Sequence, residues 1–488
     1  MGSRERMSPA DAAWLHMDRP TNLMVINAVT WFDAPLDWTV VRKTVDERMV
    51  SRFPRFRQRV AESPLPLLGG PHWEDDRYFA LENHVHHVAL PSPGDQEALQ
   101  EFVGDLMSMP LDRTKPLWHL YLVDGYGGGC ATVFRIHHSI GDGIALGEVL
   151  LSLTDPADGV AVDVPAEPQH AASHRHGLTG LLDSVTWPAA TGIHAAATGV
   201  HAADALAHEG IQALIHPSRL RDIATLGRDE VAALAKLTFT PPDARTVLRG
   251  PGVVSKRAVW APPIPLADVK AIGRPMHATV NDVLLSAVSG ALGRYLQRRE
   301  SLVDNVRTFV PFNVRPAGEP PATTLGNKFG LVFLDLPVGL RDPRERLAEV
   351  SRRMDAVKNS SEGPVSFGML SGVGLTPTTV EKRIIDFFTA KATAVMTNVA
   401  GPPKPVSFAG VPVAGVVSWV PRSGDTPIGL SIFSYSGQVL VGLAVDAALV
   451  PEPASILTGM QEELDELREL ATSGAAREQA RVDASATG

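Results

Sequence analysis

The amino-acid sequence predicts an α/β protein with two domains. A chain of 488 residues is too long for one ordinary hydrophobic core, so two domains of roughly 200 residues each are expected. Apolar residues form 44% of the chain and charged residues 20%, which is typical of a folded globular protein. Short apolar runs rich in β-branched residues alternate with stretches whose apolar residues recur at helical spacing. This alternation predicts strands and helices together.

The composition narrows the class of partner and the compartment. The net charge is −9 and no block of basic residues is present, which argues against nucleic acid as a partner. The single cysteine, Cys130, excludes an internal disulfide framework and fits a reducing cytoplasm. We expect neither a secretory signal peptide nor a transmembrane helix, because the chain lacks a charged start followed by an apolar run and lacks any long uninterrupted apolar stretch. Membrane contact should therefore be peripheral.

The first elements follow from capping signals and strand-like runs. Ser8 before Pro9 predicts a capped helix, and residues 23–32 predict a strand. Asp37 caps a further helix, which should end near Pro54.

Two polar clusters in this half could be binding sites. Arg55, Arg57 and Arg59 alternate along what we expect to be an extended segment, and a solvated strand face explains them better than a phosphate site. His84 and His86 share one face of a predicted strand, but no nearby cysteine or carboxylate completes a metal site there. We therefore expect no metal.

The middle of this half predicts a strand, a turn and a helix. Residues 99–106 have helical apolar spacing, residues 110–118 form a proline-stiffened connector, and residues 119–123 predict a strand. Residues 130–136 are apolar and β-branched enough for a buried strand, and residues 144–151 again show helical spacing.

The turn that follows the buried strand carries the sequence His137-His138-Ser139-Ile140-Gly141-Asp142-Gly143. We expect Gly141 and Gly143 to supply the backbone freedom that such a turn needs. Successive strand side chains point to opposite faces, so His137 and His138 cannot both face one metal ion; one should face a cavity and the other pack behind it. A histidine in this place is largely neutral at pH 7 and can accept a proton, which makes it a candidate general base.

The chain changes character between residues 155 and 221, where Ala, His and Gly are frequent and large apolar residues are few. We interpret this segment as a partly helical linker between the domains. Its leucines and Trp187 could dock on a membrane surface, but almost no Lys or Arg accompanies them, so a plain crossover explains it better. Residues 256–260 then predict a strand, and residues 456–470 predict an amphipathic, acidic helix.

Another helix in the second half begins with a capping signal. Thr279 and Asp282 have the spacing of a capping box, which gives Asp282 a structural explanation. Asn281 would then lie in the first helical turn, beside unpaired backbone N–H groups and the positive end of the dipole. There it could donate to a developing oxyanion. A solvent-facing asparagine explains the local sequence equally well, and both interpretations stay open.

The string HHxxxDG at residues 137–143 is the signature of the CoA-dependent acyltransferase superfamily. Further motifs make the chain resemble one family within it, the wax ester synthase/diacylglycerol acyltransferase (WS/DGAT) family. They occur in the family's order over nearly the whole chain: Met7-Ser8-Pro9-Ala10-Asp11, Pro54-Arg55-Phe56-Arg57-Gln58-Arg59, Pro116-Leu117-Trp118, Val280-Asn281-Asp282-Val283-Leu284, Asn313-Val314-Arg315-Pro316, Leu325-Gly326-Asn327 and Thr397-Asn398-Val399-Ala400-Gly401-Pro402.

The resemblance implies a fold of two chloramphenicol acetyltransferase-like α/β domains joined by a partly helical linker, with an active-site channel at their interface. On this basis we expect four segments along the chain. These are an N-terminal acyltransferase domain with the HHxxxDG motif (7–160), a helical linker (161–235), a C-terminal acyltransferase-like domain (236–471) and a disordered tail (472–488).

The resemblance also implies an activity. Members of the family are O-acyltransferases that move a long-chain acyl group from acyl-CoA to diacylglycerol, giving triacylglycerol, or to a long-chain fatty alcohol, giving a wax ester. Acyl-CoA is then a co-substrate, and neither a cofactor nor a metal is required. The expected location is cytoplasmic, with peripheral attachment to the inner membrane face or to lipid inclusions.

The matched motifs imply roles for individual residues. His138 would be the general base, and His137, Asp142 and Gly143 would complete the catalytic motif. Asp142 would be mainly architectural, paired with an arginine for which Arg315 is our candidate. The structural residues would be Asp282 and Arg315. The residues that bind substrate would be Asn281 and the Pro-Leu-Trp motif, which consists of Pro116, Leu117 and Trp118.

Two functions of other classes stay open. A condensation-type enzyme would acylate a polyketide or peptide held on a carrier protein, and would not use long-chain acyl-CoA. An inactive relative would bind lipid inclusions without catalysis. Loss of acyl transfer in a folded His138→Ala variant would support the catalytic function over that of an inactive lipid-binding relative.

Overall fold

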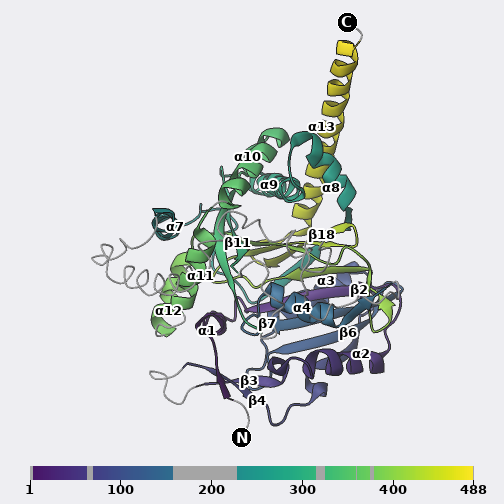
Figure 1. Cartoon of the computed structure of the whole chain (residues 1–488), viewed down its shortest axis with the longest axis vertical. Helices are drawn as coiled ribbons and strands as arrows, with labels where there is room; N and C mark the ends of the chain where they lie inside the picture. Colours follow the sequence, from purple (N-terminus) through teal and green to yellow (C-terminus); the bar gives the residue numbers. More distant parts are fainter. Residues whose placement is uncertain are drawn as a thin grey trace, which may run out of the picture.

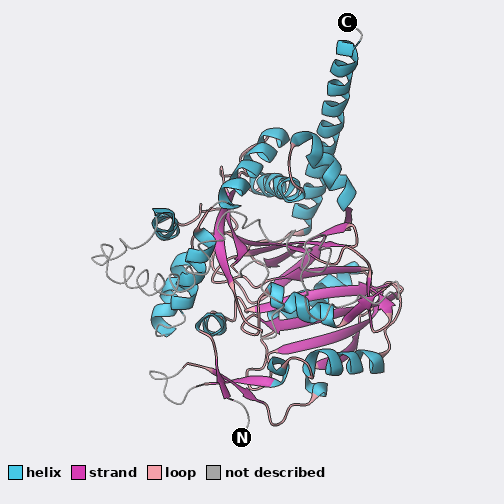
Figure 2. Ribbon diagram, viewed as in Figure 1, coloured by secondary structure: helices cyan, strands magenta, loops and turns pink. Residues whose placement is uncertain are grey.

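The computed structural model describes residues 4–62, 70–157, 228–314, 325–358, 360–373 and 378–486, and all structural statements below refer to these residues. Two large mixed sheets form the body of the molecule, and most helices lie on their outer faces (Figures 1 and 2). This is the two-domain α/β arrangement expected from the sequence.

The N-terminal sheet has five strands in the order β16-β2-β7-β6-β5. Every pair is antiparallel except β5 with β6. β7 is buried along nearly its whole length, which fits its continuous apolar sequence. The strands are β2 (Val25–Phe32), β5 (Val85–Ala89), β6 (Trp118–Tyr126), β7 (Gly129–His137) and β16 (Gly415–Trp419).

The C-terminal sheet has seven strands, six of them in the order β10-β18-β17-β13-β11-β12, with β9 also paired to β18. β13 is parallel to both of its neighbours, and the other pairs are antiparallel. The strands are β9 (Lys256–Trp260), β10 (Ile264–Pro265), β11 (Val306–Asn313), β12 (Phe329–Leu336), β13 (Ala394–Ala400), β17 (Ile428–Tyr435) and β18 (Gln438–Asp446).

The two halves exchange strands. β16 belongs in sequence to the second half, yet it completes the N-terminal sheet by pairing with β2. In a small third sheet, β8 of the first half pairs with β14 of the second. That sheet consists of β8 (Thr154–Pro156), β14 (Val406–Phe408) and β15 (Val411–Pro412), and a fourth sheet consists of β1 (Arg4–Arg6), β3 (Gln58–Ala61) and β4 (His72–Asp75).

The helices cover the sheets. Figure 1 shows α8, α9, α10 and the start of α13 together on the outer side of the C-terminal sheet, and α3 lies where the two sheets meet, packed against β9. The helices of the first half are α1 (Pro9–His16), α2 (Trp38–Val45), α3 (Gln96–Ser108) and α4 (Gly143–Ser152), with short helices at Asp46–Val50, Pro54–Arg57 and Leu81–Asn83. Those of the second half are α7 (Arg228–Phe239), α8 (Leu266–Gly273), α9 (Val280–Arg298), α10 (Pro343–Lys358), α11 (Glu362–Val373), α12 (Thr378–Thr389) and α13 (Ala454–Ala486), with a short helix at Arg274–Met276.

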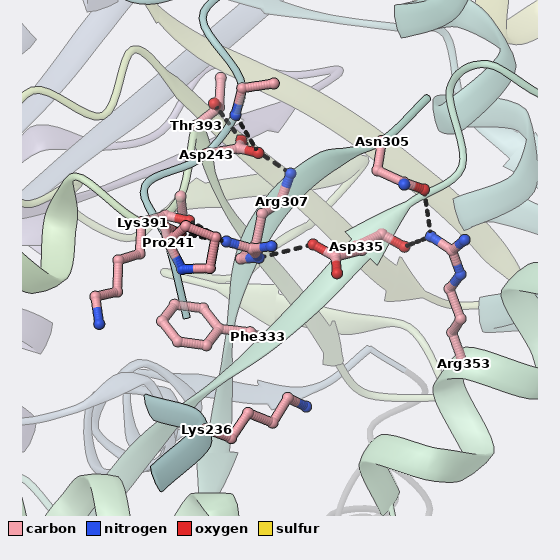
Figure 3. Close-up of polar contacts among 12 residues, drawn as sticks. Lys236, Pro241, Asp243, Asn305, Arg307, Phe333, Asp335, Arg353, Lys391 and Thr393 are labelled. Atoms are coloured by element: carbon pink, nitrogen blue, oxygen red, sulfur yellow. Dashed lines mark hydrogen bonds and ion pairs between the residues drawn. The ribbon is translucent and has the colours of Figure 1, made fainter. Parts of the chain in front are cut away.

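Arg307 on β11 anchors the segment that follows α7 to the C-terminal sheet (Figure 3). Its guanidinium donates to Asp335 Oδ1 at 2.7 Å and to the Pro241 carbonyl at 2.9 Å. Its backbone N–H donates to Asp243 Oδ2 at 3.0 Å, and the hydroxyl of Thr393 donates to the same oxygen. The chain that leaves α7 is therefore held against β11 and the start of β13 by polar contacts, of which the Thr393–Asp243 bond is buried.

Two local predictions differ from the structure. Arg55 and Arg57 lie on a short helical turn that begins at Pro54, so the extended face predicted for them is wrong. Proline fixes φ near the helical value and is favoured at the first position of such a turn. The Arg55 guanidinium stacks 4.5 Å from the ring centroid of Trp73 instead of lining a solvated strand.

α13 continues as a helix to Ala486, through residues for which the sequence predicts a tail. These residues are rich in Ala, which is the strongest helix former. The linker expected at 161–235 lies outside the described residues up to 227, and the domain bounds stay predictions. Among the described helices, none combines the length and apolar composition that crossing a bilayer requires.

Candidate active site

The predicted strand, turn and helix are present, with β7 ending at His137 and α4 beginning at Gly143. Backbone hydrogen bonds fix the turn between them. The N–H of His137 donates to the Leu117 carbonyl at 2.9 Å, and the N–H of His138 donates to the Met24 carbonyl at 2.7 Å. The two histidines are thus held by the residues that directly precede β6 and β2.

His137 is buried behind the turn. Its Nδ1 accepts from the backbone N–H of Ser139 at 3.1 Å and lies 2.8 Å from the Ser139 hydroxyl. An acceptor Nδ1 carries no proton, so the ring proton is on Nε2, which faces Asp18 Oδ2 at 3.8 Å. The described contacts thus give Nδ1 a hydrogen-bond partner, whereas Nε2 lies near Asp18 without a hydrogen bond.

His138 lies on the other side, in contact with two aromatic rings. Trp14 of α1 stacks on it with ring centroids 4.2 Å apart, and Phe329 at the start of β12 is 5.4 Å away. The residue is only 3% exposed. Burial lowers the pKa of the imidazole to about 4, although the Asp142 carboxylate acts in the opposite direction. The imidazole is therefore neutral at pH 7 and has a free electron pair to accept a proton.

Asp142 joins the turn to the second half of the chain. Its Oδ1 accepts from the N–H groups of Ile144 and Ala145 at 3.1 and 3.0 Å and so caps α4. Its Oδ2 accepts from the N–H of Lys328 at 2.9 Å. These contacts tie α4 to the residues just before β12, while the expected pairing of Asp142 with an arginine stays a prediction. The predicted partner, Arg315, lies outside the described residues.

Asn327 is a site residue that the sequence alone did not single out, although the Leu-Gly-Asn motif that contains it was recognised. Its Nδ2 donates to the His138 carbonyl at 2.8 Å and to Asp11 Oδ1 at 2.7 Å. The signal in the sequence was the coincidence of three motifs, which contain Asp11, His138 and Asn327. The fold brings these three motifs into one polar cluster.

Asp11 is the third member of this cluster and is buried in α1. Its backbone N–H is capped by the Ser8 hydroxyl, as the sequence predicts, and its Oδ1 also accepts from the backbone N–H of Asn327 at 3.2 Å. Burial raises the pKa of Asp11 against these hydrogen bonds. A buried carboxyl of this kind requires donors, and Asn327 supplies two of them.

α1 is in turn held by α12. His16 Nδ1 lies 2.8 Å from Glu381 Oε2, and Arg19, just after α1, pairs with Asp386. The hydrogen bond to Glu381 raises the pKa of His16, while burial raises the pKa of Glu381. Trp14, which covers His138, is therefore attached to the second half of the chain through its own helix.

The glycines of the turn do not have the backbone role expected of them. Neither Gly141 nor Gly143 is among the glycines with positive φ, so the prediction that the turn needs their conformational freedom is wrong. The turn is made with ordinary backbone angles, and Asp142 between them has a φ of −81°. A Cβ on Gly143 would stand in open space at the start of α4.

The Pro-Leu-Trp motif lies behind the histidines. The Leu117 carbonyl holds His137, and Trp118 is fully buried, with its indole N–H donating to the Phe56 carbonyl at 2.9 Å. These contacts give Leu117 and Trp118 a clear packing role. The substrate-binding role of the motif, including Pro116, stays a prediction.

The start of α9 contains the predicted capping box. Thr279 Oγ1 accepts from the N–H of Asp282, and Asp282 Oδ2 accepts from the N–H of Thr279. Asn281 lies in the first turn, and its Oδ1 accepts from Asn398 Nδ2 at 2.8 Å. The described polar contacts of His138 come from Asn327 and the backbone, and Asn281 is not among them. Its role toward an oxyanion stays a prediction.

The arrangement can perform proton transfer. A neutral imidazole lies where the two halves of the chain meet, and no described group of three or more His, Cys, Asp or Glu side chains is placed to hold a metal ion. The two rings that pack on the imidazole, Trp14 and Phe329, are aromatic, so a substrate that reaches it would meet an apolar surface there.

Comparisons with known proteins agree on one family. The profile described as "Wax ester synthase/diacylglycerol acyltransferase catalytic domain" matches residues 7–284, and the "WS/DGAT C-terminal domain" profile matches residues 325–468. A "Probable diacyglycerol O-acyltransferase tgs1" of Mycobacterium tuberculosis is 28% identical over 84% of this chain and 83% of its own. The "O-acyltransferase WSD" of Acinetobacter baylyi is 24% identical over 94% of this chain and 96% of its own.

Solved structures agree on the fold. The wax ester synthase/diacylglycerol acyltransferase from Marinobacter aquaeolei VT8 superposes with a TM-score of 0.66 at 20% identity, covering 96% of this chain and all of that one. The first condensation domain of the CDA synthetase gives a TM-score of 0.56 at 16% identity, with 96% of each chain covered. At these identities the structural matches speak for the fold alone.

Proposed function

The chain belongs to the wax ester synthase/diacylglycerol acyltransferase family, and from this premise we propose that it moves a long-chain acyl group from acyl-CoA to diacylglycerol, to a long-chain fatty alcohol, or to both, with His138 as the general base. The observation that carries the proposal is the state of His138. Its imidazole is neutral at pH 7 and packs against the rings of Trp14 and Phe329 where the halves meet, and Asn327 donates to the backbone carbonyl of the same residue.

The reaction needs both substrates beside this ring. His138 takes the proton of the acceptor hydroxyl as the hydroxyl oxygen attacks the thioester carbonyl. The tetrahedral intermediate collapses with loss of the CoA thiolate, which receives the proton from His138. The products are free CoA and a triacylglycerol or wax ester, and no covalent enzyme intermediate is required.

Asn281 remains our candidate for stabilising the oxyanion of this intermediate. Its Oδ1 is occupied by Asn398, which leaves the Nδ2 group as the donor. It lies in the first turn of α9, where unpaired backbone N–H groups and the helix dipole favour negative charge.

Substrate access requires movement, because Trp14 and Phe329 cover the imidazole. We place the passage between the halves of the chain. A cavity of about 20 Å³, enough for one or two waters, lies there. It is lined by Leu23 and Val25, on either side of the residue that holds the His138 backbone, and by Trp419 from the second half.

A larger cleft, of about 630 Å³, is a poorer candidate for the active site. It runs along α10 and shares no lining residue with the His138 cluster. Its Arg353 is already paired, because the guanidinium donates to Asn305 Oδ1 at 2.7 Å and to Glu349 Oε1 at 2.6 Å (Figure 3 shows the first of these contacts).

The lipid substrates suggest peripheral attachment to a membrane face or to lipid inclusions. Phe239 at the end of α7 is 72% exposed, and Phe387 on α12 is 46% exposed. Lys382 and Arg383 are also exposed on α12. Exposed aromatic residues beside basic ones are suited to an anionic lipid surface.

Two other functions were considered. The condensation-domain similarity supports a shared fold and says nothing more specific about the substrate. The profile matches over residues 7–284 and 325–468 favour acyl transfer to a lipid alcohol instead. An inactive lipid-binding protein would differ from the proposed enzyme in giving no acyl-transfer product.

The test is a direct assay. Purified protein is incubated with labelled palmitoyl-CoA and either diacylglycerol or hexadecanol, and the lipids are separated. We expect product with at least one acceptor and a loss of at least about 100-fold in the His138→Ala variant, which is the contribution expected of a general base. His87→Ala removes a part-exposed imidazole on β5 and serves as the matched control. Product from neither acceptor, or full turnover by folded His138→Ala, would refute the proposal.

A further inference from the structure

We propose that Asn327 is a positioning residue for His138: its amide oxygen accepts the Nδ1–H of the imidazole, which leaves Nε2 as the atom that takes the substrate proton. The inference rests on the proposed role of His138 as the base. It assigns a purpose to the Leu-Gly-Asn motif and to the buried Asp11, neither of which the reaction scheme has used.

The orientation of the Asn327 amide follows from its neighbours. Nδ2 donates to the His138 carbonyl at 2.8 Å and to Asp11 Oδ1 at 2.7 Å. A carbonyl oxygen accepts only, and the same holds for a carboxylate, so the NH₂ group must be on this side. The amide oxygen is then directed away from Asp11.

Trp14 Nε1 and His137 Nε2, both buried beside the site, lack a hydrogen bond among the described contacts, and so do two atoms of the cluster itself. One is His138 Nδ1 and the other is Asn327 Oδ1. Imidazole Nδ1 can carry a proton and an amide oxygen can accept it, so each is the kind of partner that the other lacks. Leaving both buried and unpaired costs free energy, which favours a hydrogen bond between them.

The electrostatics agree with this pairing. The Asn327 side chain acts to raise the pKa of His138, against the dominant lowering by burial. An acceptor at Nδ1 has this effect because it stabilises the imidazolium ion. The same interaction would stabilise the imidazolium that forms when His138 takes a proton during catalysis.

Asp11 fixes the orientation of the Asn327 amide. Its Oδ1 accepts from both the backbone N–H and the side-chain NH₂ of Asn327, so the amide cannot rotate. An amide does not pass a proton on, so Asp11 and Asn327 can only orient and polarise the His138 imidazole. This differs from a catalytic triad, in which the middle residue is itself the base. Asp11 and His138 belong to the first half and Asn327 to the second, so the base is oriented only when the halves are together.

All other charged and titratable groups around His138 have different tasks. Asp142 caps α4 and holds Lys328, and His137 bonds to Ser139 and lies near Asp18. The rings of Trp14 and Phe329, which pack on the imidazole, carry no charge.

The first experiment compares pH profiles of kcat/KM for the wild type and Asn327→Asp. The added carboxyl faces the imidazole and can share a proton with Asp11, and it should move the acid limb of the profile upward by about one pH unit or more. Asn305→Asp is the matched control: Asn305 holds Arg353 at a distance from the site, and its profile should not move. An unchanged limb in folded Asn327→Asp would overturn the proposal.

A second experiment does not depend on any variant of Asn327. Nitrogen NMR of ¹⁵N-histidine-labelled protein reports which ring nitrogen carries the proton, and the His138 signals are assigned by their loss in His138→Ala. We expect the Nδ1–H form of His138 at neutral pH. The Nε2–H form would overturn the inference, whereas a His138→Ala variant with full activity would overturn the proposed function instead.

Discussion

Replacing Asp142 with alanine should destabilise the protein more than removal of an ordinary helix cap, because its carboxylate serves both halves of the chain. One oxygen accepts from the N–H groups of Ile144 and Ala145, and the other accepts from Lys328 at 2.9 Å. A cap contributes about 1 kcal/mol, and a hydrogen bond to a buried charged group about 1.5–3 kcal/mol. We therefore expect Asp142→Ala to lower the free energy of unfolding by about 2.5–4 kcal/mol.

Asp37 provides the matched comparison, because it caps α2 through one hydrogen bond to Val40 at 3.0 Å and is exposed. Asp37→Ala should cost only about 1 kcal/mol. Asp142→Asn should fall between the two, since asparagine is a good cap but presents only one oxygen. Urea unfolding followed by tryptophan fluorescence measures all three. If Asp142→Ala costs no more than Asp37→Ala, the contact with Lys328 does not join the halves.

Three further predictions concern pH, glycines and a buried ion pair. As the pH falls from about 6.5 to about 4, the unfolded chain binds a proton at His138 that the folded protein does not bind, so the free energy of unfolding should fall by up to about 3 kcal/mol because of this residue. The value of kcat/KM should decline below about pH 4, where the base becomes protonated. Measurements of stability and of activity as a function of pH check both expectations. Gly147→Ala, which adds a Cβ in open space on α4, should raise stability by about 0.5–1 kcal/mol, whereas Gly293→Ala, whose Cβ would stand 2.3 Å from a backbone oxygen, should lower it by about 1–3 kcal/mol, as measured by thermal unfolding. Arg346→Leu leaves Glu463 buried without its nearest partner and should cost about 3–5 kcal/mol in urea unfolding, and a cost below 1 kcal/mol would show that the pair is not structurally important.

Local signals in the sequence identified the elements that surround the site. Ser8 and the pair Thr279 and Asp282 cap their helices as predicted, since a cap depends on residues only three positions apart. Strand alternation does not extend to His138, because β7 ends at His137. The His138 ring packs against Trp14 and Phe329, and the cavity expected beside one of the histidines stays a prediction.

Contacts between distant residues could not be predicted in this way. Asn327 meets Asp11 across 316 positions and His138 across 189, and no periodicity or capping rule spans such separations. The motif list contained all three residues, but their meeting depends on the packing of two sheets. The turn at Arg55 shows the converse problem, because alternation of arginines suggested a strand while Pro54 favoured a helical turn.

The exchange of strands has a consequence for the integrity of the molecule. β16 is hydrogen-bonded along β2, and β14 along β8, so each half contributes edges to sheets that the other half needs. A single protease cut between residues 157 and 228 would break the covalent connection without removing either set of pairings. The two fragments should then elute together in native chromatography and separate only in denaturant, as a nicked protein does when interlocked sheets hold it.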